Sequence, residues 1–121
     1  RRIFVSWSSL LAEIGLTTPP SVLKMDIEGF EWEILEQIVR SHALMPVSLT
    51  VELHYKSQFP KVPFHGRFLS PFEMGAWADF MFTRGGYVLV DRRDHSVCLH
   101  CCEVVFARLV EPGLAPLQQR G

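Results

Sequence analysis

The sequence predicts an α/β domain, in which a largely parallel sheet carries helices on its faces and ends in an antiparallel hairpin. Two observations lead to this prediction. Short apolar runs, typical of buried strands, alternate along the chain with segments of helical periodicity, which favours right-handed strand–helix–strand crossovers. The last two β-prone runs, 87–90 and 97–107, are separated by a short polar segment at 92–95 that is typical of a hairpin turn.

The first half of the chain contains a short helix, a strand and a longer helix. Ser8 is the expected cap of the short helix, and Gly15 is its expected stop. The apolar run 22–25 predicts a buried strand. From 29 to 40 the apolar residues follow a helical period, with Glu31 and Glu33 in the first turn and Arg40 in the last, as the helix dipole favours.

The second half begins with a strand at 47–54, where apolar and polar residues alternate strictly. Its polar face starts with small residues and becomes charged only at Glu52 and His54. After a longer loop, Ser70 with Pro at the next position and Glu73 three residues after the cap predicts a helix start, and Gly85-Gly86 ends that helix. The final strand is expected to run antiparallel, at or near an edge of the sheet.

The bulk composition excludes several classes of protein. With 121 residues and 48% hydrophobic content, the chain has the composition of one globular domain. Twelve basic and thirteen acidic residues give a net charge of -1, so there is no basic surface of the kind that binds nucleic acid. No apolar run reaches the roughly 18 residues of a membrane span. No feature of the sequence indicates a compartment.

Four polar residues stand where ligands bind in an open α/β sheet, at the carboxyl ends of strands. Asp26 and Glu28 follow the strand at 22–25, and Glu52 and His54 end the strand at 47–54. If these strands are neighbours, three carboxylates and an imidazole converge on one crevice. A strand that continued to Glu28 would place both acids of the first pair on one side.

Each of these residues also has a purely structural interpretation. Glu28 is equally suited to interact with free N–H groups at the start of the helix. Glu52 could pair with a nearby Lys or Arg, and His54 could be a satisfied loop histidine. The same four side chains are also a possible metal site, in which carboxylate oxygens suit Mg²⁺ or Mn²⁺ and the imidazole of His54 favours a transition metal.

The three cysteines, Cys98, Cys101 and Cys102, form a C-x-x-C-C pattern. With His95 and His100 nearby, this pattern superficially suggests zinc, but no second ligand pair stands at the usual spacing. The favoured interpretation is that the cysteines are small apolar residues of a strand, because free Cys is commonly buried. An odd number of cysteines leaves no complete disulfide framework.

The segment V-L-K-M-D-I-E-G-F-E-W-E-I-L resembles the "lKiDvEGaE-x-x-vL" signature of FkbM-type and methyltransferase-like domains, which are class I S-adenosylmethionine-dependent methyltransferases. The resemblance covers roughly residues 3 to 108 and includes L-L-A-E-I-G-L, T-V-E-L-H, G-G-Y-V-L-V and C-C-E-V-V-F-A-R in the corresponding order. It implies a Rossmann-like class I methyltransferase fold, in which these segments form the fourth strand onwards.

The resemblance also implies a function for the four polar residues. Asp26 would lie at the mouth of the cleft, near the methyl donor and the acceptor, and Asp26 and Glu28 would contact S-adenosyl-L-methionine. Asp26, Glu52 and His54 are the implied catalytic residues. If a hydroxyl is the acceptor, a carboxylate or His54 would remove its proton as the methyl group moves to oxygen. The expected acceptor is a small molecule or a glycan-like substrate.

Two elements of the family pattern do not occur in the sequence. These are the glycine-rich loop after the first strand and the acidic residue that holds the ribose. We therefore expect residues 1–110 to be the C-terminal half of a methyltransferase domain, inactive by itself, and residues 111–121 to be a loose tail. Two alternatives are a metal-dependent enzyme that uses Asp26, Glu28, Glu52 and His54, and a non-catalytic module that keeps the fold but not the reaction.

Overall fold

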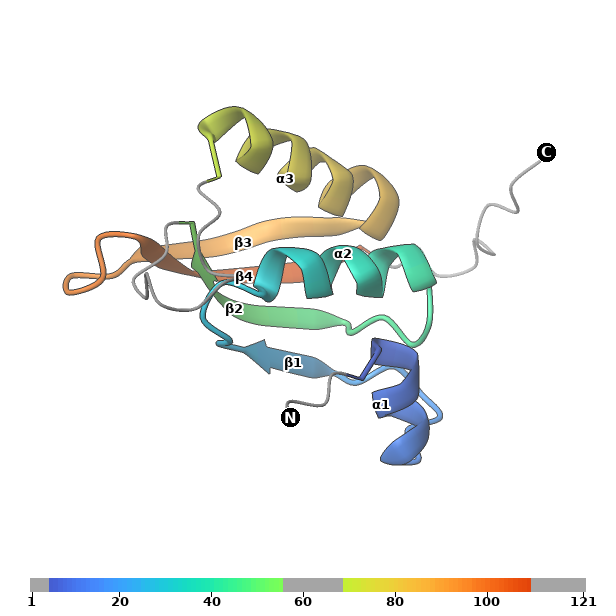
Figure 1. Ribbon diagram of the computed structural model, residues 1–121. Coiled ribbons are helices and arrows are strands. Elements are labelled where there is room, and N and C mark those ends of the chain that lie inside the picture. The colour runs from blue at the N-terminus through green and yellow to red at the C-terminus, as the bar shows by residue number, and fades with distance from the viewer. Residues whose placement is uncertain (1–4, 56–68, 110–121) are drawn as a thin grey trace.

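The structure of the protein is a computed structural model that describes residues 5–55 and 69–109 (Figure 1). The tail predicted at 111–121 and nearly all of the loop predicted between 55 and 69 lie outside these residues. The described elements are α1 (Trp7–Glu13), β1 (Val22–Met25), α2 (Glu31–Ser41), β2 (Ser48–His54), α3 (Pro71–Gly85), β3 (Tyr87–Asp94) and β4 (Cys101–Arg108).

The strands form one mixed sheet in the order β1-β2-β4-β3. β1 and β2 are parallel neighbours, with Val22 opposite Ser48 and Met25 opposite Val51. β4 runs antiparallel to both β2 and β3. The α/β class and the antiparallel direction of the last strand are therefore confirmed, and β4 lies one strand in from the edge that β3 forms.

Helices α2 and α3 pack side by side on one face of the sheet (Figure 1). Trp32 of α2 meets Trp77 of α3 edge to face, with ring centroids 4.7 Å apart, and Trp77 in turn meets Phe106 of β4 at 6.0 Å. Under the helices lies a core of side chains that are at most 8% exposed, which includes Leu35, Ile38, Val39, Leu49, Val51, Met81, Tyr87, Val104 and Phe106.

Helices were expected on both faces of the sheet, but in the described residues α2 and α3 cover only one. The alternation of β2 shows the consequence, because Leu49 and Val51 are completely buried while Ser48, Thr50 and Glu52 are only partly buried. Small polar residues on that side are compatible with partial exposure, whereas a strand covered on both faces is nearly all apolar.

The helix ends confirm one predicted cap and correct another. Ser70 and Glu73 form the predicted capping box at the start of α3, in which each side chain accepts from the other residue's backbone N–H. Helix α1, in contrast, begins two residues earlier than predicted: its cap is Ser6, whose hydroxyl accepts from the N–H of Ser9 at 3.1 Å. Ser8 lies inside this helix.

The predicted hairpin is present, but its turn was placed wrongly. β3 continues through the segment predicted as the turn, since Arg93 lies opposite Glu103 and Asp94 opposite Cys102. The connection instead occupies residues 95–100, and β4 begins at Cys101, later than the position 97 that was predicted. A polar run can remain in a strand here because β3 is an edge strand whose residues 89–94 are exposed.

Candidate functional site

The chain leaves β1 through a tight turn that a buried carboxylate holds in place. β1 ends at Met25, and Glu28 and Gly29 have positive φ values of 58° and 107°. Glu31, the first residue of α2, is 0% exposed, and its carboxylate accepts from the N–H groups of Ile27 and Gly29, both at 2.9 Å. Because a non-glycine residue rarely adopts positive φ, these two hydrogen bonds stabilise a conformation that Glu28 would otherwise avoid.

Glu31, and not Glu28, therefore binds the free N–H groups of the turn that precedes this helix. The sequence interpretation left Glu28 divided between contacts with free N–H groups at the helix start and the site, and treated Glu31 only as an acid near the helix dipole. The sequence did contain a signal for this role of Glu31. It is the third acid of D-x-E-G-x-E, and it stands four residues after Ile27 and two after Gly29, whose N–H groups it binds. In the described residues, Glu28 makes no hydrogen bond to the helix N-terminus and instead faces the end of the neighbouring strand.

His54, the last residue of β2, is fixed from two sides although it is only 8% exposed. Its Nδ1 lies 2.9 Å from Oε1 of Glu31. Trp32 donates its indole N–H to the backbone oxygen of His54 at 2.6 Å. Because a carboxylate only accepts, Nδ1 is the donor, and in the neutral imidazole this leaves the lone pair on Nε2.

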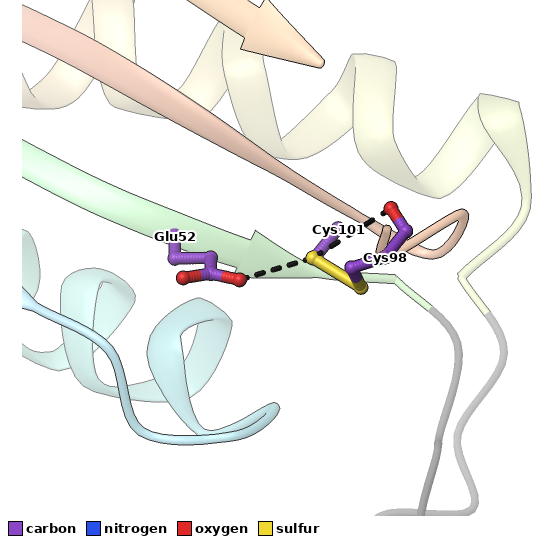
Figure 2. A group of neighbouring side chains, drawn as sticks. All are labelled: Glu52, Cys98 and Cys101. Atoms are coloured by element: carbon purple, nitrogen blue, oxygen red, sulfur yellow. Dashed lines mark hydrogen bonds between the residues drawn. A yellow bond between two sulfur atoms is a disulfide. The ribbon is translucent and has the colours of Figure 1, made fainter. Parts of the chain in front are cut away.

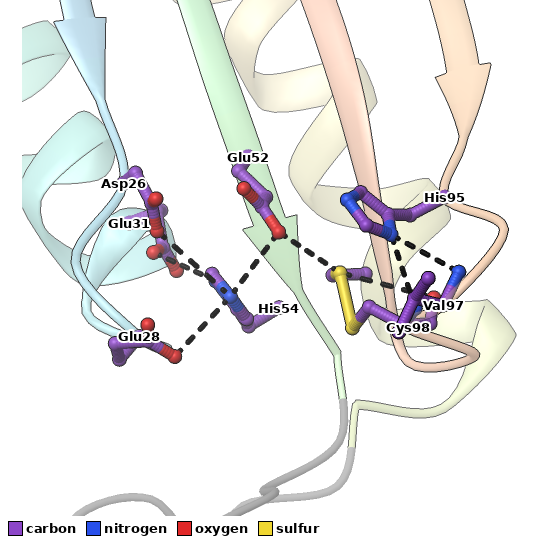
Figure 3. Close-up of a disulfide and its surroundings, with 9 residues drawn as sticks. Asp26, Glu28, Glu31, Glu52, His54, His95, Val97 and Cys98 are labelled. Atoms are coloured by element: carbon purple, nitrogen blue, oxygen red, sulfur yellow. Dashed lines mark hydrogen bonds and ion pairs between the residues drawn. A yellow bond between two sulfur atoms is a disulfide. The ribbon is translucent and has the colours of Figure 1, made fainter.

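Three further carboxylates surround Nε2 of His54 (Figure 3). The nearest oxygens are those of Glu28 at 3.4 Å, Glu52 at 3.7 Å and Asp26 at 4.0 Å. Asp26 and Glu28 are about half exposed, at 49% and 51%, whereas Glu52 is 20% exposed. We call His54 with Asp26, Glu28, Glu31 and Glu52 the acidic cluster.

Asp26, Glu28, Glu52 and His54, which were selected from the sequence, therefore do lie together. What brings them together differs in part from the strand alternation that was predicted. Asp26 and Glu28 face the same imidazole because of the turn, since β1 ends before either of them and strand alternation does not apply. His54 is a buried residue of the strand and not a loop histidine. In the described part of the chain, Glu52 has no Lys or Arg partner and faces His54 and a cysteine sulfur.

The cysteines lie beside the acidic cluster, in a disulfide that the sequence interpretation did not predict. Cys98 and Cys101 are bonded, and Sγ of Cys101 lies 3.0 Å from Oε1 of Glu52 (Figure 2). The interpretation as small, free strand residues is wrong for this pair and correct for Cys102, which is free and buried. Burial raises the pKa of the Cys102 thiol, against the opposing effect of Arg92, so this sulfur is a weak ligand.

Two sets of donors are close enough to share an ion. The atoms of Asp26, Glu31 and His54 lie within 4.8 Å of one another, as do those of Glu52, Cys98 and Cys101. The second set needs reduced sulfurs. His95 does not complete it, because its Nδ1 accepts from the N–H groups of Val97 and Cys98, at 3.2 and 3.1 Å, and so closes the turn before β4.

A groove of about 310 Å³ lies elsewhere, between α2 and α3. Aromatic side chains form most of its apolar wall, with Glu33, Glu36 and Arg40 on the α2 side; the aromatic residues are Trp32, Phe72, Trp77 and Phe80. None of its lining residues belongs to the acidic cluster, and none is a Ser, Thr, Cys, His or Lys. The groove offers carboxylates but no histidine, whereas the strand ends bring a buried histidine among four carboxylates.

Comparisons of the sequence with protein-family models and with curated proteins, and of the fold with solved structures, gave no significant match. In the described residues, no helix has both the length and the apolar character that crossing a membrane requires. What the protein does must therefore be inferred from the acidic cluster and its position in the sheet.

Proposed function

We propose that this chain belongs to an S-adenosyl-L-methionine-dependent methyltransferase that transfers a methyl group to a hydroxyl of a small-molecule or glycan-like acceptor. The observation that carries the proposal is the conformation of D-x-E-G-x-E. This segment forms a turn, closed by Glu31, that brings Asp26 and Glu28 to within 4.0 Å of the histidine at the end of the adjacent parallel strand.

The position of the cluster supports the proposal. Asp26 and Glu28 follow β1, and Glu52 and His54 end β2, so all four are at the carboxyl ends of two parallel neighbours, where open α/β sheets bind their ligands. A terminal antiparallel strand, which the resemblance implies, is present as β4. We propose a Rossmann-like methyltransferase fold, of which residues 1–110 form the C-terminal half.

The charge of the cluster also fits the cofactor. S-adenosyl-L-methionine carries a sulfonium and an ammonium group, and half-exposed carboxylates such as Asp26 and Glu28 attract cations. When bound, the cofactor would supply the methyl group. Asp26 and Glu28 are the residues of this chain that we propose to hold it, on the side of the cleft that the strand ends form.

Asp26 is the proposed general base, because its carboxylate is accessible and adjoins the imidazole of His54. It would accept the proton of the acceptor hydroxyl as the oxygen takes the methyl group. His54 and Glu52 would position the acceptor beside Asp26. Glu31 acts through His54, whose ring it orients, and is therefore a positioning residue.

Titration calorimetry with S-adenosylhomocysteine on the full-length natural protein tests the cofactor assignment. We expect one binding site per chain in protein whose circular dichroism shows a folded α/β domain. Absence of heat from such folded protein would contradict the proposal. Binding without methyl transfer to any hydroxyl acceptor would instead support the non-catalytic module.

Asp26→Asn tests the base. Loss of a general base lowers kcat by about 10²- to 10⁴-fold. The cofactor affinity should fall as well, because the charge of Asp26 is also proposed to attract the cofactor. Asp79→Asn is the matched control, because Asp79 is an exposed acid of α3 outside the acidic cluster. An unchanged kcat in Asp26→Asn would remove Asp26 from the reaction.

A further inference from the structure

We propose that the acidic cluster binds a divalent transition-metal ion. Its ligands are Nε2 of His54 and carboxylate oxygens of Asp26, Glu28 and Glu52, and Glu31 is the residue that orients His54. The inference rests on the geometry of these five side chains and does not depend on methyl transfer.

The first argument is the orientation of the imidazole. A metal-binding histidine nearly always donates its other ring N–H to a carboxylate or carbonyl, which fixes the tautomer and turns the free nitrogen toward the ion. Glu31 provides this partner at 2.9 Å, and its carboxylate is itself held by the N–H groups of Ile27 and Gly29. The ring is 8% exposed, so its direction is set by packing and by this bond.

The second argument is the spacing of the donor atoms around Nε2. Glu28, Glu52 and Asp26 stand 3.4, 3.7 and 4.0 Å away, all beyond the roughly 3.2 Å limit of a good hydrogen bond. Ligands that bind one ion at about 2.0–2.2 Å lie about 3–4 Å from each other in tetrahedral or octahedral geometry. The distances to Nε2 are compatible with a shared ion, and the donor atoms of Asp26, Glu31 and His54 already lie within 4.8 Å of one another. Glu28 and Glu52 would move toward the ion to complete its ligands.

The third argument is charge. With Nδ1 donating to Glu31, the neutral ring presents a lone pair to three carboxylates, and all four groups are acceptors. A cation among them makes this arrangement favourable, either a proton on Nε2 or a metal ion, and Mn²⁺ binding distinguishes the two. The side chains of His54 and Glu52 are only 7% and 20% exposed. Solvent therefore screens the repulsion between the Nε2 lone pair and the Glu52 carboxylate incompletely.

The donor set indicates which ion fits. One imidazole nitrogen with carboxylate oxygens suits Mn²⁺, Fe²⁺ or Zn²⁺, whereas Mg²⁺ and Ca²⁺ prefer oxygen alone. The half-exposed carboxylates of Asp26 and Glu28 lie on the open side and provide a route of entry. An ion at this point would adjoin any acceptor that Asp26 contacts.

The test uses Mn²⁺ alone with the full-length protein, followed by the loss of the free-ion signal in electron paramagnetic resonance. We expect one ion per chain. Asp26→Asn and Glu28→Gln should each weaken binding at least tenfold, and Glu31→Gln about 10- to 100-fold, the range typical of a partner that orients a ligand. Glu33→Gln removes an exposed acid of α2 outside the cluster and should leave the affinity unchanged.

A Cys98→Ser/Cys101→Ser variant separates the two donor sets. Retained Mn²⁺ binding supports the acidic cluster, whereas loss of binding would place the ion at Glu52 and the sulfurs and overturn the proposal. Absence of Mn²⁺ binding, or equal affinity in the Asp26→Asn/Glu28→Gln double variant, would also overturn it. Circular dichroism confirms that each variant is folded. Because neither cofactor nor acceptor is present, a failure of methyl transfer has no bearing on this result.

Discussion

The parallel half of the sheet and its hairpin half are built in opposite ways. In the parallel half, formed by β1, β2 and α2, side chains such as Leu35, Ile38 and Leu49 are 0% exposed. In the hairpin, β3 buries Tyr87 at its start, but Leu89 and Val90 are 54% and 60% exposed. Only β4, the strand between the two halves, contributes a regular buried row from the hairpin, through Val104 and Phe106.

This difference shows why the acidic cluster lies where it does. Its five residues follow β1, lie at the end of β2 or begin α2, and the core immobilises these elements on one face. The short connection at 26–30 is therefore held in a fixed geometry. The exposed end of β3 has no such support. The hairpin meets the site where β4 pairs with the end of β2, with Glu103 opposite Glu52 and Cys101 opposite His54, and where the sulfur of Cys101 touches Glu52.

The largest expected effect is a difference between the two halves in how much their side chains contribute to the free energy of unfolding. Leu35→Ala removes a completely buried side chain of α2 and should lower the free energy of unfolding by about 2–5 kcal/mol. Val90→Ala, in the exposed part of β3, should change it by no more than about 0.5 kcal/mol. Urea denaturation of both variants measures this contrast, and equal losses would show that the halves share one core more evenly than their burial indicates.

A second prediction concerns a side-chain hydrogen bond between the two halves. The hydroxyl of Tyr87 donates to the backbone oxygen of Pro46 at 2.7 Å, and burial raises the pKa of Tyr87 from 10.0 to about 12, despite the opposing effect of Arg108. The unfolded chain therefore loses this proton first as the pH rises. The associated stability is complete below about pH 10 and is lost between about pH 10 and 12, by roughly 2–3 kcal/mol.

Tyr87→Phe should lack this pH-dependent loss, because phenylalanine does not ionise. Urea midpoints of the two proteins, measured from pH 8 to 12, give the comparison. At neutral pH the variant should be about 1 kcal/mol less stable, since the Pro46 oxygen loses its donor. Parallel curves for wild type and variant would show that Tyr87 titrates normally in the folded protein.

The last prediction concerns a buried carboxylate inside the parallel half. Glu31→Gln keeps the size of the buried side chain but replaces one acceptor oxygen with an amide, which leaves one of its N–H or imidazole partners unsatisfied. We expect a loss of about 1–3 kcal/mol. Thermal unfolding of this variant beside Glu33→Gln, an exposed acid on the same helix, measures it. Equal stability of the two would mean that the turn at 26–30 does not depend on Glu31.

The sequence by itself determined the local structure and the identity of most cluster residues. Alternation at 47–54, helical periodicity at 29–40 and the capping box of Ser70 and Glu73 are each decided by neighbouring residues, and each element formed. Asp26, Glu28, Glu52 and His54 were selected because polar residues that end a buried strand of a parallel sheet meet at one edge, and they do.

Only the tertiary structure decided what these residues contact. The burial of Glu31, the direction of Nε2 in His54 and the Cys98–Cys101 bond beside Glu52 depend on which strands become neighbours and on how closely α2 packs. The length of β3 was decided in the same way, since pairing with β4 retained polar residues that local propensity assigned to a turn. Periodicity reports the environment of a segment, whereas contacts between distant segments depend on the whole fold.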